Sequence, residues 1–350
     1  MNRAVKTSEI PQCRGLPPHP DVLSLGRAQE GADSARLFKN DLGQPPRAHV
    51  FVYGRQQMSW LRKPTVISTV LLSTLCGSQL LAQNRELTPP EIVNLSLLID
   101  GRSTEVVTHI YRPSGPGAFP IMIFTHGHVV PPADLRDPIT ADVASWWLQR
   151  GFAIVAPVRP GYGKTGGAFR EAQNLTWQGA SCVGQPTYEI AMLKVREVVL
   201  ATLEWAQNQS WVKRDRVLLV GQSTGGLETI ATVATNPEGV IGGINFAGGM
   251  GGNPAISPGK SCKPELLTAI YGRLGKTTHV PTLWLYAEND LFWGIDAPKQ
   301  WFEAFKAGGS DTNLVQTPPV PGGVDGHRLV FAGGPLWRPS VDLFLDRIKQ

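Results

Sequence analysis

Residues 217–226 read VLLVGQSTGG, an apolar run that enters a Gly-x-Ser-x-Gly turn, and the sequence after it predicts a helix up to Thr235. Such a turn lifts the hydroxyl of Ser223 off the end of a strand, and it leaves no room for side chains at Gly221 and Gly225. The positive end of the following helix suits an oxyanion that forms beside the serine. The pattern indicates a nucleophilic serine. The alternative is a purely structural strand, turn and helix, because a chain with 38 glycines can contain this pentapeptide by chance.

The first 57 residues do not resemble folded protein. Hydrophobic periodicity is not sustained there, and prolines interrupt the segment, among them Pro17, Pro18, Pro20, Pro45 and Pro46. We therefore expect residues 1–57 to be disordered or to be an extension upstream of the true start, for which Met58 is the candidate.

Residues 58–82 have the layout of a secretory signal peptide. Arg62 and Lys63 precede an apolar run from Val66 to Leu81, and Ala82 supplies a small residue at the expected cleavage site. We therefore expect a secreted or periplasmic protein. An uncleaved membrane-anchoring helix or a buried helix is the alternative. A lipoprotein signal at Cys76 is less favoured, because the residue before it is a bulky leucine.

The positive net charge of +5 comes entirely from residues 1–82. Residues 1–82 hold 10 of the 33 Lys and Arg and 5 of the 28 Asp and Glu, which leaves 23 residues of each sign from residue 83 onward. The remaining chain is neutral and gives no reason to expect nucleic acid or an anionic membrane as a partner. Its two cysteines, Cys182 and Cys262, are expected to form a disulfide in an exported protein, with two unlinked thiols as the alternative.

Residues 83–350 alternate strand-like and helix-like segments, which predicts a single α/β domain with a mostly parallel sheet of about eight strands and no large cap. The expected strands are 92–99, 105–111, 121–125, 153–158, 217–220, 239–246, 282–286 and 314–317. The expected helices are 141–150, 188–208, 226–235, 297–307 and 338–348.

A serine nucleophile needs a base, and the base needs an orienting acid. His327 lies in a glycine-containing loop after the last expected strand, where its imidazole can reach the turn. Asp290 follows the apolar strand 282–286, and Glu288 and Asp325 compete with it for the role of acid. The order Ser223, Asp290, His327 is the order of a nucleophile-elbow triad.

Two backbone amides are expected to bind the oxyanion. One is the N–H of Thr224, and the other is the N–H of His128 in the loop after strand 121–125, where Gly127 permits close approach. His126 is interpreted as a hydrogen-bonded structural residue beneath this loop. A metal site at the two imidazoles is the weaker alternative, because no carboxylate lies at ligand spacing. No metal or other cofactor is expected.

These residues together resemble the α/β-hydrolase superfamily, and most closely its dienelactone-hydrolase and prolyl-oligopeptidase-like serine hydrolases. The resemblance covers residues 105–348 and is carried by 120–127, 156–163, 221–226, 286–290 and 326–327. It implies Ser223 as nucleophile, Asp290 as orienting acid and His327 as general base and acid. Val158 and Pro160 depart from the group's arginine loop, so only a structural role is assigned to Arg159.

The loops 166–185 and 247–260 are expected to border the site, and neither is long enough for a large lid. No propeller domain that could select peptides precedes the domain either, so we expect an esterase acting on a small or medium carboxylic ester that reaches an open cleft as its small-molecule substrate. A peptidase or amidase with the same triad is one alternative, and a catalytically silent binding protein on the same fold is another. The oligomeric state is left open.

Overall fold

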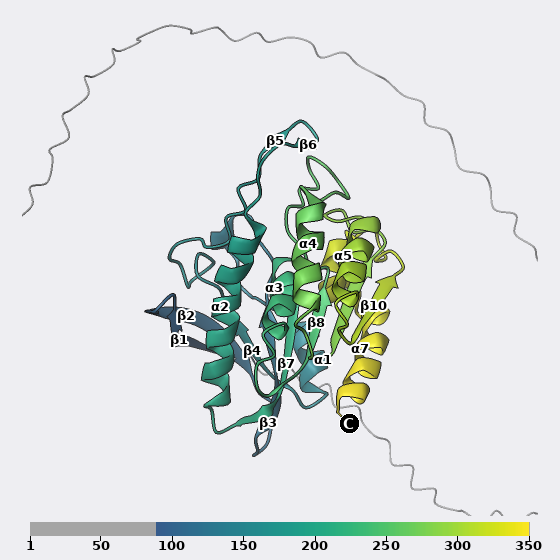
Figure 1. Cartoon of the computed structure of the whole chain (residues 1–350). Helices are drawn as coiled ribbons and strands as arrows, with labels where there is room; N and C mark the ends of the chain where they lie inside the picture. Colours follow the sequence, from purple (N-terminus) through teal and green to yellow (C-terminus); the bar gives the residue numbers. More distant parts are fainter. Residues whose placement is uncertain (1–88, 350) are drawn as a thin grey trace, which may run out of the picture. The chain divides into compact units, whose positions relative to one another are not determined.

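The computed structural model describes residues 89–349, so the expected extension (1–57) and signal peptide (58–82) lie outside the described residues. Within them the main sheet consists of β1 (Glu91–Ile99), β2 (Arg102–Tyr111), β3 (Phe119–Thr125), β4 (Ala153–Pro157), β7 (Val212–Gln222), β8 (Val240–Phe246), β9 (Thr282–Ala287) and β10 (Thr312–Thr317) (Figure 1). The helices are α1 (Ala141–Leu148), α2 (Tyr188–Gln207), α3 (Thr224–Val233), α4 (Pro264–Gly275), α5 (Asp296–Lys306), α6 (Leu329–Ala332) and α7 (Gly334–Ile348).

The strand order is β1-β2-β4-β3-β7-β8-β9-β10. The six strands from β4 to β10 in this order are parallel, whereas β2 pairs antiparallel with both β1 and β4. The mostly parallel eight-stranded sheet expected from the sequence is confirmed. Because the carboxyl ends of parallel strands share one edge, the turns after β3, β7 and β9 lie at the same edge, where α/β proteins form their sites.

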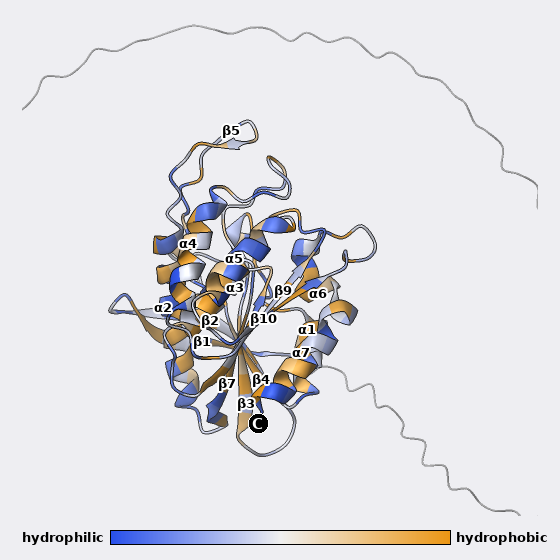
Figure 2. Ribbon diagram, turned by 45° about the vertical axis from the view of Figure 1, so that its right-hand side comes forward, coloured by the Kyte–Doolittle hydropathy of each residue, from blue (hydrophilic) through white to orange (hydrophobic). Residues whose placement is uncertain are grey.

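Helices cover both faces of the sheet, and the alternation of side chains along β7 shows why. Val217 and Leu219 pack in a core shared with α2, α3, α4 and α5, while Leu218 and Val220 pack with α1, α6 and α7 on the other face. Strands buried on both sides are apolar at every position, as residues 217–220 are. Figure 2 shows the hydrophobic strands between these two groups of helices.

All eight expected strands and all five expected helices are present, with boundaries shifted by a few residues. The largest shifts are at the start of β7, five residues earlier than expected, and at the start of α7, four residues earlier. Helices α4 and α6 were not expected, and neither was a short hairpin of β5 (Trp177–Gln178) and β6 (Ser181–Cys182).

The expected disulfide joins Cys182 in β6 to Cys262, just before α4, with 5.3 Å between the two Cα atoms. It connects two chain segments that are 80 residues apart. In the chain-entropy account, closing a loop of this length stabilises the fold by about 4–5 kcal/mol. No helix within residues 89–349 combines the length and the apolarity that crossing a membrane requires.

Candidate active site

Ser223 occupies a sharp turn between β7, which ends at Gln222, and α3, which begins at Thr224. Its backbone has φ 58° and ψ −124°, a combination that L-residues rarely adopt and that is typical of strained functional sites. A Cβ atom at Gly221 would collide with the carbonyl of Gly225, and one at Gly225 would collide with the backbone of Thr125 and His126, where β3 ends. The expectation that the turn leaves no room for side chains is therefore confirmed.

Three side chains that are far apart in the sequence form one hydrogen-bonded chain. Ser223 Oγ lies 2.9 Å from His327 Nε2, and His327 Nδ1 lies 3.1 Å from Asp290 Oδ2. The exposed fractions of the three residues are 7, 6 and 2%. The structure thus brings together the three residues that the sequence assigned to a triad, in the geometry that passes a proton from a serine to an imidazole.

The carboxylate of Asp290 is held by the backbone that follows β9. Its Oδ1 accepts hydrogen bonds from Phe292 N at 2.8 Å and Trp293 N at 3.1 Å, which leaves Oδ2 for His327. Glu288, a competitor in the sequence, is exposed and lies outside this network. The local turn therefore fixes which oxygen of Asp290 faces the imidazole.

The second competitor, Asp325, shapes the loop that carries the imidazole. Its Oδ1 accepts hydrogen bonds from the backbone amides of His327 and Leu291, both at 2.9 Å. Gln222 Nε2 donates to the carbonyl of His327 at 3.0 Å, and the ring of Phe292 stacks on the imidazole at 4.0 Å between centroids. These contacts fix the loop and the ring plane, so Asp325 orients the histidine through its backbone.

The two expected oxyanion donors lie next to Ser223. Thr224 is the first residue of α3, so its N–H has no acceptor within the helix. Gly127 O lies 2.7 Å from His126 Nδ1. The C=O and N–H of a trans peptide point in opposite directions, so the N–H of His128 is directed away from His126. Among residues 89–349, neither amide donates to a backbone or side-chain acceptor. A Cβ at Gly127 would meet the end of the Gln222 side chain and lie 3.0 Å from Ser223 Cβ, so a larger residue here would require Gln222 to move.

A buried ion pair supports this loop from behind, and the sequence did not predict it. Arg159 Nε donates to Glu171 Oε1 at 2.5 Å, and both side chains are 1% exposed. The guanidinium also donates to the carbonyls of His126 and Gly127. Arg159 therefore has the structural role assigned to it, and Glu171 is the partner that makes its burial possible.

His126 is a hydrogen-bonded residue beneath the loop, as expected. Burial, and secondarily the charge of Arg159, hold the pKa of His126 well below its usual 6.5. The neutral imidazole accepts from Arg159 N through Nε2 at 3.1 Å, so its Nδ1 is the atom that donates to Gly127 O. Residues 89–349 contain no group of three His, Cys, Asp or Glu side chains placed to hold a metal ion.

Glu228 is a second unexpected carboxyl beneath the site. It lies in α3 with no exposed surface, and neither of its oxygens has a hydrogen-bond partner among the described residues. Burial raises the pKa of Glu228 well above 4.5, an effect that Arg159 opposes and Glu171 reinforces. The folded protein therefore holds Glu228 protonated at pH values where the unfolded chain has released the proton.

We expect Glu228→Gln to become more stable than the wild type as the pH rises. Above about pH 4.5 the folded wild type binds one proton more than the unfolded chain, so its free energy of unfolding falls with pH through this group. The amide cannot ionise, so the advantage of the variant grows by at most about 1.4 kcal/mol per pH unit. Urea unfolding at pH 5 and pH 8 measures the difference in the free energy of unfolding between the variant and the wild type. Glu288→Gln, which makes the same change on an exposed side chain, is the control. A difference that does not change with pH would contradict an uncharged Glu228.

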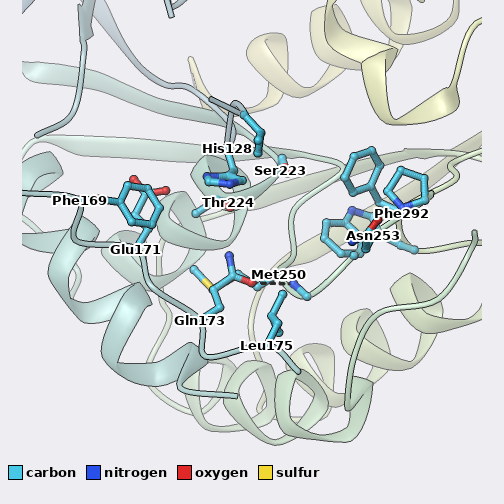
Figure 3. A pocket seen from close by; sticks show the side chains of 15 residues that line it. His128, Phe169, Glu171, Gln173, Leu175, Ser223, Thr224, Met250, Asn253 and Phe292 are labelled. Atoms are coloured by element: carbon cyan, nitrogen blue, oxygen red, sulfur yellow. Dashed lines mark hydrogen bonds between the residues drawn. The ribbon is translucent and has the colours of Figure 1, made fainter. Parts of the chain in front are cut away.

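A cavity of about 630 Å³ opens beside Ser223 and Thr224. Its walls come from segments 169–175 and 250–254 and from His128, Phe292 and Trp293 (Figure 3). The expectation that these two loops border the site is confirmed. The Cys182–Cys262 disulfide joins the two loops a few residues beyond the walls they contribute. The lining is mostly apolar, and the charge of Glu171 is neutralised by its ion pair with Arg159.

No protein-family model matches the chain, and no curated protein matches it. Solved structures do resemble it. The esterase Pf2001 of Pyrococcus furiosus matches in two crystal forms, with TM-scores of 0.53 and 0.52 and identities of 14 and 15% over 74% of this chain, and these matches cover 91 and 93% of the esterase. The 2,6-dihydroxy-pseudo-oxynicotine hydrolase matches with a TM-score of 0.50 and 16% identity over 74% of this chain and 67% of that one. The chain therefore has the α/β-hydrolase fold.

Proposed function

We propose that the protein is an exported serine hydrolase that cleaves carboxylic esters through an acyl-enzyme intermediate. The observation that carries the proposal is the hydrogen-bonded chain from Ser223 through His327 to Asp290. Ser223, at one end of this chain, lines a cavity large enough for a small or medium ester. The solved structures of similar fold include an esterase, which agrees with this class of reaction.

In the proposed reaction Ser223 Oγ attacks the ester carbonyl while His327 Nε2 accepts the hydroxyl proton. Asp290 keeps the Nδ1 proton in place and stabilises the imidazolium. The negative oxygen of the tetrahedral intermediate is bound by the N–H groups of His128 and Thr224. His327 then donates its proton to the departing alcohol, and a water molecule activated by the same imidazole releases the acid.

The cavity supports a neutral substrate. Its surface is mainly apolar, and Glu171, the acidic residue in its wall, has both carboxylate oxygens engaged by Arg159 and Tyr162. An anionic or cationic substrate would lose hydration in such a cavity without gaining a partner of opposite charge. Export is supported by the signal-like sequence of residues 58–82 and by the disulfide between Cys182 and Cys262.

A fluorophosphonate probe tests the serine, and a substrate panel tests the class. We expect the probe to label the protein stoichiometrically, with the adduct on the peptide that contains Ser223. p-Nitrophenyl esters of short acids should be hydrolysed with a larger kcat/KM than aminoacyl p-nitroanilides. Faster cleavage of the anilides would favour the peptidase alternative. Absence of labelling in folded protein would favour a silent binding protein.

A further inference from the structure

A relay of three side chains fixes the proton positions on His128. Tyr162 Oη lies 2.6 Å from Glu171 Oε2 and 2.7 Å from His128 Nδ1. Glu171 also accepts from the guanidinium of Arg159, so both of its carboxylate oxygens act as acceptors. The single hydroxyl proton of Tyr162 therefore goes to Glu171, and His128 must donate its Nδ1 proton to the phenol oxygen.

The other ring nitrogen of His128 is consequently an acceptor. His128 is an exposed residue, but the groups around its ring desolvate it and lower its pKa, an effect that Glu171 opposes and Arg159 reinforces, so the ring is neutral at pH 7. A neutral ring protonated at Nδ1 carries a lone pair on Nε2. Within residues 89–349 no donor hydrogen-bonds to this atom, and the ring belongs to the wall of the cavity beside Ser223, with Phe169 at 5.5 Å between ring centroids.

The position of His327 indicates which part of an ester lies near His128. His327 protonates the leaving alcohol, and its ring stacks on Phe292, so the leaving group belongs on the Phe292 side of Ser223. In Figure 3, His128 and Phe169 lie on the opposite side of Ser223 from Phe292. The acyl group of the substrate therefore lies toward His128.

Covalent geometry then limits the distance of the matching substrate group. The N–H of His128 binds the carbonyl oxygen, and Nε2 of the same residue lies within about 6 Å of that nitrogen. A donor that reaches Nε2 at hydrogen-bond distance therefore lies within about 12 Å of the carbonyl oxygen, and a hydroxyl on the second or third carbon of the acyl chain falls within this reach.

We propose that His128 is a specificity-determining residue whose Nε2 accepts a hydrogen bond from a hydroxyl on carbon 2 or 3 of the acyl chain, so that the preferred substrates are hydroxyacyl esters. Tyr162 and Glu171 are positioning residues that keep the proton on Nδ1 and the lone pair in the cavity. This inference rests on the proposed esterase activity and names the acyl group for the same site.

The substrate test compares p-nitrophenyl butyrate with its 2-hydroxy and 3-hydroxy analogues. For each hydroxy ester, kcat/KM is divided by that of butyrate, which removes losses common to both substrates. We expect His128→Phe to lower at least one of these ratios about fivefold, because the variant keeps a flat ring and the backbone N–H but has no acceptor. Tyr162→Phe should lower the same ratio about twofold, because the proton is then free to occupy either nitrogen.

Phe169→Leu is the matched control. It reshapes the wall beside the imidazole without removing an acceptor, so both ratios should stay within about twofold of the wild type. If His128→Phe also leaves both ratios unchanged, the proposal is wrong. A drop in a ratio that is equally large in Phe169→Leu would assign the preference to cavity shape and would also overturn it.

A second measurement does not depend on activity or on the folding of a variant. In wild-type protein labelled with ¹⁵N-histidine, long-range proton–nitrogen correlations at pH 7.5 should give His128 a protonated Nδ1 and an unprotonated Nε2. The opposite tautomer would overturn the proposal. A protein that keeps this tautomer but is not labelled by the fluorophosphonate would instead lack the proposed esterase activity, so the two failures can be distinguished.

Discussion

Replacing Ser223 with alanine should lower kcat for p-nitrophenyl esters about 10⁶-fold, to the rate of the uncatalysed reaction plus a residual from the oxyanion amides. The change removes the hydroxyl that His327 Nε2 contacts at 2.9 Å, and no other atom of this residue can attack a carbonyl. The side chain is small and buried, and the change removes one hydrogen bond, so the free energy of unfolding should change by no more than about 1.5 kcal/mol. Initial rates and urea unfolding of the same preparation measure both effects.

The exposed Ser181, next to the disulfide in β6, supplies the control. Ser181→Ala should keep full activity and full fluorophosphonate labelling, whereas Ser223→Ala should lose both. A Ser223→Ala protein that retains more than about 1% of the wild-type kcat would show that another nucleophile carries the reaction. The choice of Ser223 would then be wrong even with the fold unchanged.

The grouping of Ser223, Asp290 and His327 could be predicted because each of these residues follows a local rule. The Gly-x-Ser-x-Gly turn is contiguous in the sequence, and its glycines are required by backbone collisions that any chain with this turn would suffer. Asp290 and His327 were found from their places after strands, since the carboxyl edge of a parallel sheet collects such residues. The structure places the three side chains within hydrogen-bond distance of one another.

The support behind the oxyanion loop could not be predicted in the same way. The ion pair of Arg159 and Glu171 and its continuation through Tyr162 depend on how a loop without regular structure folds back on itself. No spacing rule relates these residues. The burial of Glu228 could not be predicted either. The sequence predicted that Glu228 lies in a helix, but a glutamate that is buried without a hydrogen-bond partner is unusual.

Helix α4 was missed although its sequence contains a signal. Pro264 stands in the first helical turn together with Glu265, which are both typical of a helix start. Leu267, Ile270 and Tyr271 follow at helical spacing, and all three are buried against the sheet face that also carries α3. Glycines at 272 and 275 weaken the propensity of the segment, and tertiary packing of this apolar face outweighs them.

Replacing Asp290 with asparagine should lower kcat about 10⁴-fold and leave the fold intact. Oδ1 of the carboxylate accepts from the amides of Phe292 and Trp293, so the asparagine must place its own oxygen there. Its NH₂ group then takes the position of Oδ2 and faces His327 Nδ1 as a donor. The imidazole must accept at Nδ1 and carry its proton on Nε2, where it can no longer take the proton of Ser223.

Glu288→Gln is the matched control for this substitution, because it makes the same chemical change two residues earlier on an exposed side chain. It should keep kcat within about twofold of the wild type. Because the argument for Asp290 concerns the tautomer of His327, the loss in Asp290→Asn should appear in kcat rather than in KM. An equal loss in Glu288→Gln would show that the effect is not specific to Asp290. A loss in Asp290→Asn that is confined to KM would mean that the Asp290 carboxylate binds substrate. The imidazole would then be oriented by its loop, where Asp325 already holds the backbone of His327.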